Sequence, residues 1–198
     1  KAPTVFRIFS DLELHGLIEA VHGDDVPNVK NRKKGRRPVN YRIRADAAYV
    51  VGVDFWARSA AAVIQDFAGN LIAQRELCFA SPPSAEDAVD IIADLIRDML
   101  GEAGIGTEKL LGIGVGAPGS VSVTTGVVHF YARIPGMTEY PLAQTLQQRF
   151  SVPVVVTNNA SIVALAEHRY GQAHGVSSLF LFLVRAGVGG AFIQNGKL

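Results

Sequence analysis

Two adjacent asparagines, Asn158 and Asn159, have the clearest chemical meaning in this sequence. They follow the apolar run at 154–156 and precede a segment, 160–170, with the character of a helix. Side-chain amides at such a junction can both donate hydrogen bonds to hydroxyl groups and accept hydrogen bonds from them. An amide has no useful basicity near neutral pH. The pair therefore favours recognition of a hydroxyl-rich ligand, such as a sugar, over its deprotonation.

A second candidate group is Asp54, which ends the apolar strand predicted at 49–54. A carboxylate at a strand end, followed by a glycine turn and a hydroxyl residue, would suit magnesium and phosphate. The turn that follows instead contains Trp56 and ends at Ser59, with no glycine to let the backbone approach phosphate oxygens. Two interpretations stay open: Asp54 belongs to a degenerate phosphate loop, or it is a structural strand-end residue.

Two glycine-dense segments are further candidates for close contact with a ligand. The first, 112–119, contains Gly116, and the second, 187–190, contains Gly187 and Gly189. Glycine-dense junctions between strands and turns are common, so neither segment alone identifies a site. Arg185 precedes the second segment. For each segment two interpretations stay open: close approach to a ligand, or an ordinary turn.

The charge distribution divides the chain into two regions. Residues 1–44 contain ten Lys/Arg and five Asp/Glu, whereas residues 45–198 contain nine and thirteen. The net charges are therefore +5 and −4, and opposite signs suggest two separate roles. We predict two domains with these boundaries.

The N-terminal region has the pattern of a helix, a turn and two strands around a basic loop. Apolar residues at 5, 8, 9 and 12 share one helical face, and Gly16 can end the helix in a left-handed conformation. The loop at 22–38 is rich in lysine and arginine, and alternation at 39–44 predicts a returning strand. Such a helix can enter the major groove of DNA while the loop contacts phosphates. The predicted DNA contacts are Lys1, Thr4, Arg7, Lys33, Lys34, Arg36 and Arg37.

The remaining sequence predicts an α/β fold. Strands are expected at 49–54, 60–66, 71–79, 111–115, 152–157, 179–184 and 190–194, with helices at 84–99, within 139–150 and at 160–170. Ser84 is the expected N-cap of the first of these helices. A single cysteine rules out an internal disulfide, and no apolar run is long enough to span a membrane. These features suit a cytoplasmic protein, and no membrane partner is expected.

The order of the motifs resembles the ROK family of repressors, open reading frames and sugar kinases. The motifs are Gly-Val-Asp at 52–54, Gly-Val-Gly-Ala-Pro-Gly at 114–119, Pro-Val-Val-Val-Thr-Asn-Asn-Ala at 153–160 and Gly-Val-Gly-Gly at 187–190. The resemblance implies the N-terminal lobe and the start of the second lobe of an actin/hexokinase-like (ribonuclease H-like) fold at 45–198. It further implies that residues 1–44 are the recognition helix and wing of a partial winged helix-turn-helix. We expect both ends of the chain to be truncated.

The resemblance also implies roles for individual residues. Gly116, Asn158 and Asn159 are the predicted sugar contacts. The family's two phosphate loops correspond to the segment with Asp54 and Ser59 and to the segment with Gly187 and Gly189, and both are degenerate here. Family kinases carry a catalytic aspartate at the position of Asn159, and loss of a general base costs roughly 10²–10⁴-fold in rate. Arg133 replaces a family asparagine that borders the sugar, so it is either a contact that selects an acidic ligand or a solvated surface arginine. A family zinc-binding segment would lie beyond Leu198, and no cofactor or metal is expected within the chain.

These observations predict a sugar-responsive, DNA-binding regulator without kinase activity. Its expected partners are operator DNA, a sugar or sugar derivative, and a second copy of the chain in a homodimer. Two alternatives stay open: an ATP-dependent kinase of a hexose or N-acetylhexosamine, and a scaffold whose sugar site is inactive.

Overall fold

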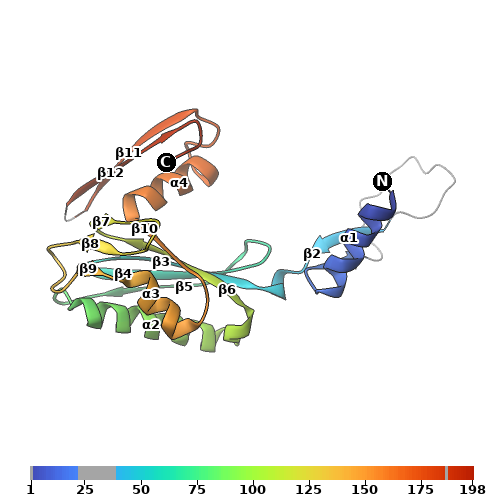
Figure 1. Cartoon of the computed structure of the whole chain (residues 1–198), viewed down its shortest axis with the longest axis horizontal. Helices are drawn as coiled ribbons and strands as arrows, with labels where there is room; N and C mark the ends of the chain where they lie inside the picture. Colours follow the sequence, from blue (N-terminus) through green and yellow to red (C-terminus); the bar gives the residue numbers. More distant parts are fainter. Residues whose placement is uncertain (1, 22–38, 186) are drawn as a thin grey trace.

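The computed structural model describes residues 2–21, 39–185 and 187–198. It shows a small N-terminal unit set apart from a larger α/β body (Figure 1). The body contains a central mixed sheet, two helices that cover one face of it, and a helix with a β-hairpin on the opposite side (Figure 1).

The N-terminal unit consists of α1 (Ala2–Leu14), β1 (Ile18–Val21) and β2 (Asn40–Ile43). Gly16 follows α1 with φ of 68°, which is the left-handed turn expected from the sequence. β1 and β2 pair in antiparallel register, and the rings of Phe9 and Tyr41 lie 5.0 Å apart between the helix and the second strand. The predicted helix and both predicted strands are therefore present.

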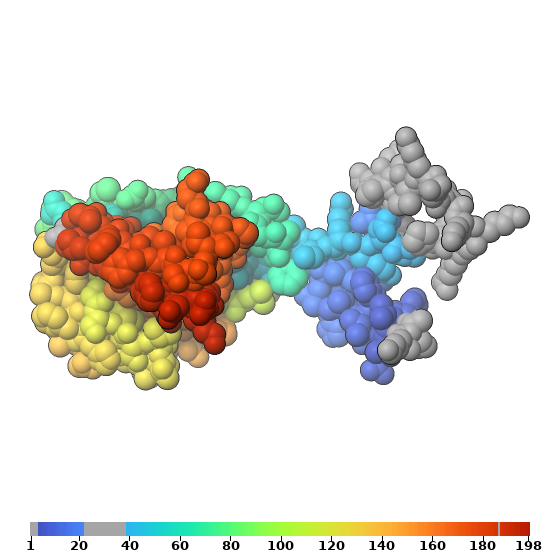
Figure 2. Space-filling model, turned by 90° about the horizontal axis from the view of Figure 1, so that it is seen from above, coloured from blue at the N-terminus to red at the C-terminus, as the bar shows by residue number. Residues whose placement is uncertain are grey.

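A short junction joins this unit to the body. It is a 3₁₀ turn, η1 (Ala45–Ala47), and Figure 2 shows that the molecule is narrow there. Asp46 forms ion pairs with Arg44 at 3.0 Å and with Lys109 at 3.8 Å, so the junction is tied to both parts.

The central sheet has the strand order β10-β6-β3-β4-β5. β3 lies parallel to β6, β6 lies parallel to β10, and β4 and β5 continue the sheet in antiparallel pairing. The carboxyl ends of the three parallel strands therefore meet at one edge, where Asp54 lies opposite Gly116 and Gly116 lies opposite Thr157. The bounds are β3 (Tyr49–Trp56), β4 (Ser59–Asp66), β5 (Leu71–Cys78), β6 (Leu110–Ala117) and β10 (Val154–Asn158).

Two helices close the main core against one face of this sheet. α2 (Ala85–Glu102) begins at the predicted cap, where Ser84 Oγ accepts a hydrogen bond of 3.1 Å from the backbone N–H of Asp87. After α2, the 3₁₀ turn η2 (Thr107–Lys109) leads into β6, and α3 (Leu142–Phe150) follows later in the chain. Their apolar faces bury residues such as Ile92 and Leu146 with less than 1% exposure. This burial stabilises the sheet and so fixes the position of the edge at which the three parallel strands end.

A three-stranded sheet was not predicted. It consists of β7 (Ser120–Val121), β8 (Val128–Phe130) and β9 (Thr138–Tyr140), joined in antiparallel pairs. Strands of two or three residues are too short to show an alternating pattern, which explains why sequence analysis missed them.

The chain ends in a second, smaller packing unit. α4 (Asn159–Tyr170) packs against β11 (Ser178–Val184) and β12 (Val188–Gln194), which form an antiparallel hairpin. β12 begins at Val188, two residues before the predicted start, so Gly189 lies within the strand. The side chains of α4 and the hairpin form a hydrophobic cluster separate from the main core.

Within the described ranges, none of the helices is both long and apolar enough to cross a membrane. The same residues contain no group of three or more His, Cys, Asp or Glu side chains arranged to hold a metal ion.

Candidate ligand-binding cleft

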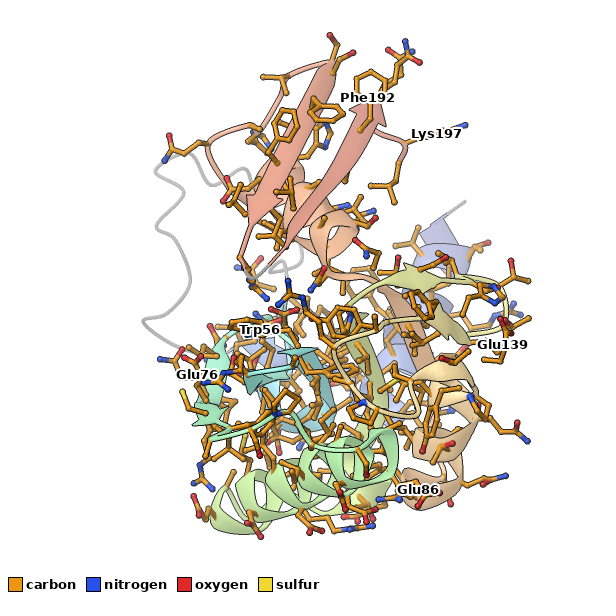
Figure 3. All side chains as sticks on the ribbon, turned by 90° about the vertical axis from the view of Figure 1, so that its left-hand side faces the viewer. Trp56, Glu76, Glu86, Glu139, Phe192 and Lys197 are labelled. Atoms are coloured by element: carbon orange, nitrogen blue, oxygen red, sulfur yellow. The ribbon has the colours of Figure 1, made fainter. Side chains whose placement is uncertain are left out.

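A cleft of about 550 Å³ lies between the β11–β12 hairpin and the edge of the central sheet where the three parallel strands end. It is open to solvent, and its lining comes from the ends of several elements. Figure 3 shows Trp56 at the level where the hairpin approaches the sheet. The lining residues are Trp56, Pro118, Gly119, Ser120, Val121, Tyr131, Asn158, Asn159, Ser161, Leu183, Arg185, Gly187, Val188, Gly189 and Gly190.

Asn158 and Asn159 both line the cleft, as expected, but their side chains are in different situations. Asn158 Oδ1 accepts a hydrogen bond of 2.9 Å from the backbone N–H of Ala160, which caps α4. Its Nδ2 donates to the carbonyl of Gly119 at 2.8 Å. The Asn159 amide has no hydrogen-bond partner among the described residues. Asn158 therefore holds the cleft wall together, and Asn159 has its full hydrogen-bonding capacity available for a ligand.

Asp54 is engaged by an arginine from the other side of the cleft. Arg185 Nη2 lies 2.8 Å from Asp54 Oδ2, and each side chain is 32% exposed. Asp54 Oδ1 is buried and has no hydrogen-bond partner. The guanidinium thus neutralises the carboxylate in the position where a cation would have to approach it.

Trp56 is the last residue of β3, so the strand runs two residues beyond the predicted end at Asp54 and Trp56 is not in the turn. Its indole Nε1 donates a hydrogen bond of 2.6 Å to Ser59 Oγ, and Ser59 is only 8% exposed. The hydroxyl of Ser59 is therefore occupied by the indole N–H. Ser59 lines a neighbouring hollow together with Asp54, Arg185 and Glu76 instead of the main cleft.

The glycines proposed as ligand contacts separate into two groups. Gly187 and Gly189 line the cleft. Gly116 is buried beneath it, where an added Cβ would lie 3.1 Å from Asp54 Oδ1 and 3.5 Å from Asn159 Cα. Gly116 does not line the cleft, and its small size lets Asp54 and α4 come close together.

Arg133 does not line the cleft that contains Asn159. It lines a separate open pocket with Trp56, Ala57, Arg58 and Pro82. The two hollows share only Trp56, so the structure places Arg133 apart from the predicted sugar contacts.

The predicted DNA contacts fall only partly within the described residues. Thr4 and Arg7 are exposed on α1, as the prediction requires. Lys1, Lys33, Lys34, Arg36 and Arg37 lie outside the described residues, and their roles stay predictions.

Sequence analysis missed the contribution of Arg185 and underestimated that of Trp56. The order of motifs placed Arg185 beside the second glycine segment, but nothing in the sequence paired it with Asp54. Such a contact depends on the approach of the hairpin to the sheet edge, which no local pattern reveals. From the sequence, Trp56 was interpreted only as part of a turn without glycine, whereas its half-buried side chain is part of the cleft wall.

Comparison with known proteins places this geometry in a family context. A sequence model of the ROK family matches residues 50–198. The xylose repressor of Caldicellulosiruptor bescii is 29% identical over 166 residues, which cover 84% of this chain and 41% of that protein.

Two solved structures share the fold. A ROK family glucokinase from Streptomyces griseus, in complex with glucose and AMPPNP, is 29% identical with a TM-score of 0.67, covering 76% of this chain and 46% of that one. A ROK family transcriptional regulator, a homologue of the E. coli MLC protein, is 16% identical with a TM-score of 0.73, covering 100% of this chain and 48% of that one. The chain spans less than half the length of each of these three proteins.

Proposed function

Because the chain belongs to the ROK family, we propose that it is a sugar-responsive, DNA-binding transcriptional regulator that does not phosphorylate its ligand. The family contains both kinases and repressors, so the residues of the cleft have to distinguish the two. Similarity to a xylose repressor supports the regulator, and similarity to a glucokinase supports sugar recognition by the same fold.

The observation that carries this proposal is the chemistry of the cleft lining. In the part of the chain that the structure describes, the lining contains no carboxylate and no imidazole. The group at the start of α4 is the amide of Asn159, which cannot accept a proton from a sugar hydroxyl near neutral pH. The carboxylate beneath the cleft, Asp54, is paired with Arg185. Phosphoryl transfer requires an oriented nucleophile and compensation of phosphate charge, and this lining supplies no base for the first.

The N-terminal unit supports the DNA-binding part of the proposal. Its helix is followed by two antiparallel strands, and the segment that connects them contains most of the predicted basic contacts. In this proposal residues 1–44 form the recognition helix and wing, and residues 45–198 form the ligand-binding lobe and the start of a second lobe. The exposed residues Thr4 and Arg7 would face DNA.

The proposed mechanism is a shift between two arrangements of the protein. A sugar bound to Asn159 between the sheet edge and the hairpin would favour one arrangement of these two parts. In a homodimer, that arrangement would set the spacing of the two DNA-binding units and hence the affinity for a paired operator site.

The first test is for phosphorylation. We expect the purified protein to form no ADP above background with ATP, magnesium and a panel of hexoses and N-acetylhexosamines, while calorimetry detects binding of at least one sugar. Asn159→Asp alone should stay inactive, because Asp54 remains paired with Arg185 in that variant.

A ROK glucokinase serves as the positive control, and Asn159→Ala sets the background. Turnover of the unchanged protein well above that of Asn159→Ala would contradict the proposal and identify a sugar kinase. Similarity to the glucokinase favours this alternative. Absence of binding to every sugar in the panel would favour a ligand-free scaffold.

A further inference from the structure

We propose that the cleft takes a neutral carbohydrate of two rings, with one ring at Asn159 and the second ring against Trp56. This inference rests on the proposed function, because it specifies the class of sugar that the regulator binds. Three properties of the cleft carry it: its uncharged hydrogen-bonding groups, its aromatic wall and its internally balanced charge.

The free hydrogen-bonding groups of the lining are neutral. Asn159, Ser120 and Ser161 line the cleft, and their side chains have no hydrogen-bond partners among the described residues. Amides and hydroxyls can donate and accept at the same position, as sugar hydroxyls also do. One backbone N–H in the first turn of α4, that of Ala160, is already bonded to Asn158 Oδ1. This end of the cleft therefore suits hydroxyl groups better than a phosphate or carboxylate.

Trp56 supplies a different kind of surface to the same cleft. Because its N–H is bonded to Ser59, the part of the indole that remains for a ligand is its apolar ring. Leu183 and Val188 from the hairpin also line the cleft. An aromatic ring with apolar neighbours suits the C–H surface of a sugar ring, whose hydroxyls can at the same time contact the glycine backbone at 187–190.

The charge of the cleft argues against an anionic ligand. Arg185 is the only Lys or Arg in the lining of the cleft as described, and its charge is balanced by Asp54 at 2.8 Å. A phosphate near Arg185 would also approach the carboxylate and would have to compete with it. The second cation considered from the sequence, Arg133, opens onto a separate pocket.

The size of the cleft fits more than one ring. Its volume of about 550 Å³ lies within the roughly 300–1,000 Å³ of sites for drug-sized ligands. Its lining combines Ser161 on α4, the loop at 118–121 and Trp56 at the end of β3. Asn159 and Trp56 therefore reach one cleft from two different elements, and a single small ring at Asn159 would leave this volume partly unfilled.

The chain offers a direct reporter for this inference, because Trp56 is its only tryptophan. We expect neutral disaccharides to shift the tryptophan emission and to bind about tenfold more tightly than the matching monosaccharides. The probes are glucose with cellobiose and maltose, xylose with xylobiose, and N-acetylglucosamine with its β-1,4-linked dimer. Glucose 6-phosphate and glucuronate test the charge argument.

Calorimetry on three variants locates the second ring. Trp56→Ala should abolish the tenfold advantage of the disaccharide and leave monosaccharide affinity nearly unchanged, whereas Trp56→Phe should retain most of the advantage. Phe67→Ala removes a partly exposed aromatic ring after the far end of β4 and should change neither affinity.

The outcomes separate this inference from the proposed function. Equal affinity for monosaccharides and disaccharides would overturn the two-ring ligand and leave the sugar-responsive regulator intact. Tighter binding of glucose 6-phosphate or glucuronate than of every neutral sugar would overturn the neutral ligand. Failure of all the probes to bind would contradict both proposals.

Discussion

At the scale of single residues, the Asp54–Arg185 pair decides much of the cleft's chemistry. A carboxylate that is partly shielded from water is costly unless a cation or hydrogen-bond donors compensate it. Asp54 Oδ1 has no donor, so the compensation of this carboxylate depends on Arg185 at Oδ2. The arginine thereby stabilises the contact between the sheet and the hairpin and occupies the position from which a cation would approach Asp54.

This pair predicts a measurable coupling in stability. Arg185→Ala should destabilise the protein more than the double variant Asp54→Ala/Arg185→Ala, because the single change leaves a carboxylate without its partner. With both side chains about a third exposed, we expect a coupling of about 1 kcal/mol in urea denaturation.

The matched control is the Arg75–Glu102 pair, in which the glutamate side chain is 65% exposed. The same comparison of single and double alanine variants at Arg75 and Glu102 should give a coupling free energy close to zero. If the effects of Asp54→Ala and Arg185→Ala on the free energy of unfolding are additive, the ion pair does not stabilise the contact between the sheet and the hairpin.

At the scale of elements, capping determines where α2 begins and how firmly it holds the core. The hydroxyl of Ser84 accepts the Asp87 N–H and also donates to the Asp87 carboxylate at 2.7 Å, so both residues are fixed at the helix start. Two acidic residues, Glu86 and Asp87, lie in the first turn, where the helix dipole favours negative charge.

Ser84→Ala is therefore expected to lower the free energy of unfolding by about 1 kcal/mol. Thermal and urea denaturation would measure the loss. Ser81→Ala is the matched control, because Ser81 is exposed and has no hydrogen bond among the described residues, and it should be neutral. Equal effects of the two substitutions would argue against the cap.

Helices and strands with a clear hydrophobic periodicity or a capping residue could be predicted from the sequence. Strands that depend on pairing with distant segments could not. The helix after Ser84, the strand that contains Asp54 and the strand-to-helix junction at Asn158 follow from local patterns, and all three are present, although the strand continues to Trp56. The small sheet at 120–140 lacks such a pattern, because its strands are stabilised by pairing with one another.

The candidate site shows the same division. Local sequence placed Asn159 at the start of a helix, so its position in the cleft could be anticipated. The pairing of Asp54 with Arg185, the burial of Gly116 and the separation of Arg133 all depend on how distant segments pack. Side-chain partners of this kind require the three-dimensional structure.

At the scale of the whole molecule, the proposed DNA contacts predict a change in salt dependence. Arg36→Ala combined with Arg37→Ala should weaken binding to all DNA sequences, because contacts to phosphates carry no sequence information. Each lost phosphate contact reduces the slope of log K against log salt by about 0.9, so we expect a reduction of about 2.

Fluorescence anisotropy with operator and unrelated DNA at several salt concentrations would measure this slope. The control, Arg75→Ala combined with Arg97→Ala, removes the same charge from the α/β body, where both arginines pair with acidic residues. A slope that is unchanged in Arg36→Ala/Arg37→Ala would contradict the assignment of residues 22–38 to a DNA-contacting wing.

The path of β3 has a mechanical consequence. Its first residue, Tyr49, follows the junction at Ala45–Ala47, and its far end carries Asp54 and Trp56. Eight extended residues span roughly 25 Å, and hydrogen-bonded neighbours on both sides make the strand stiff. A ligand that displaced Trp56 or Asp54 at one end of this strand would therefore also be expected to shift the junction with the N-terminal unit at the other end.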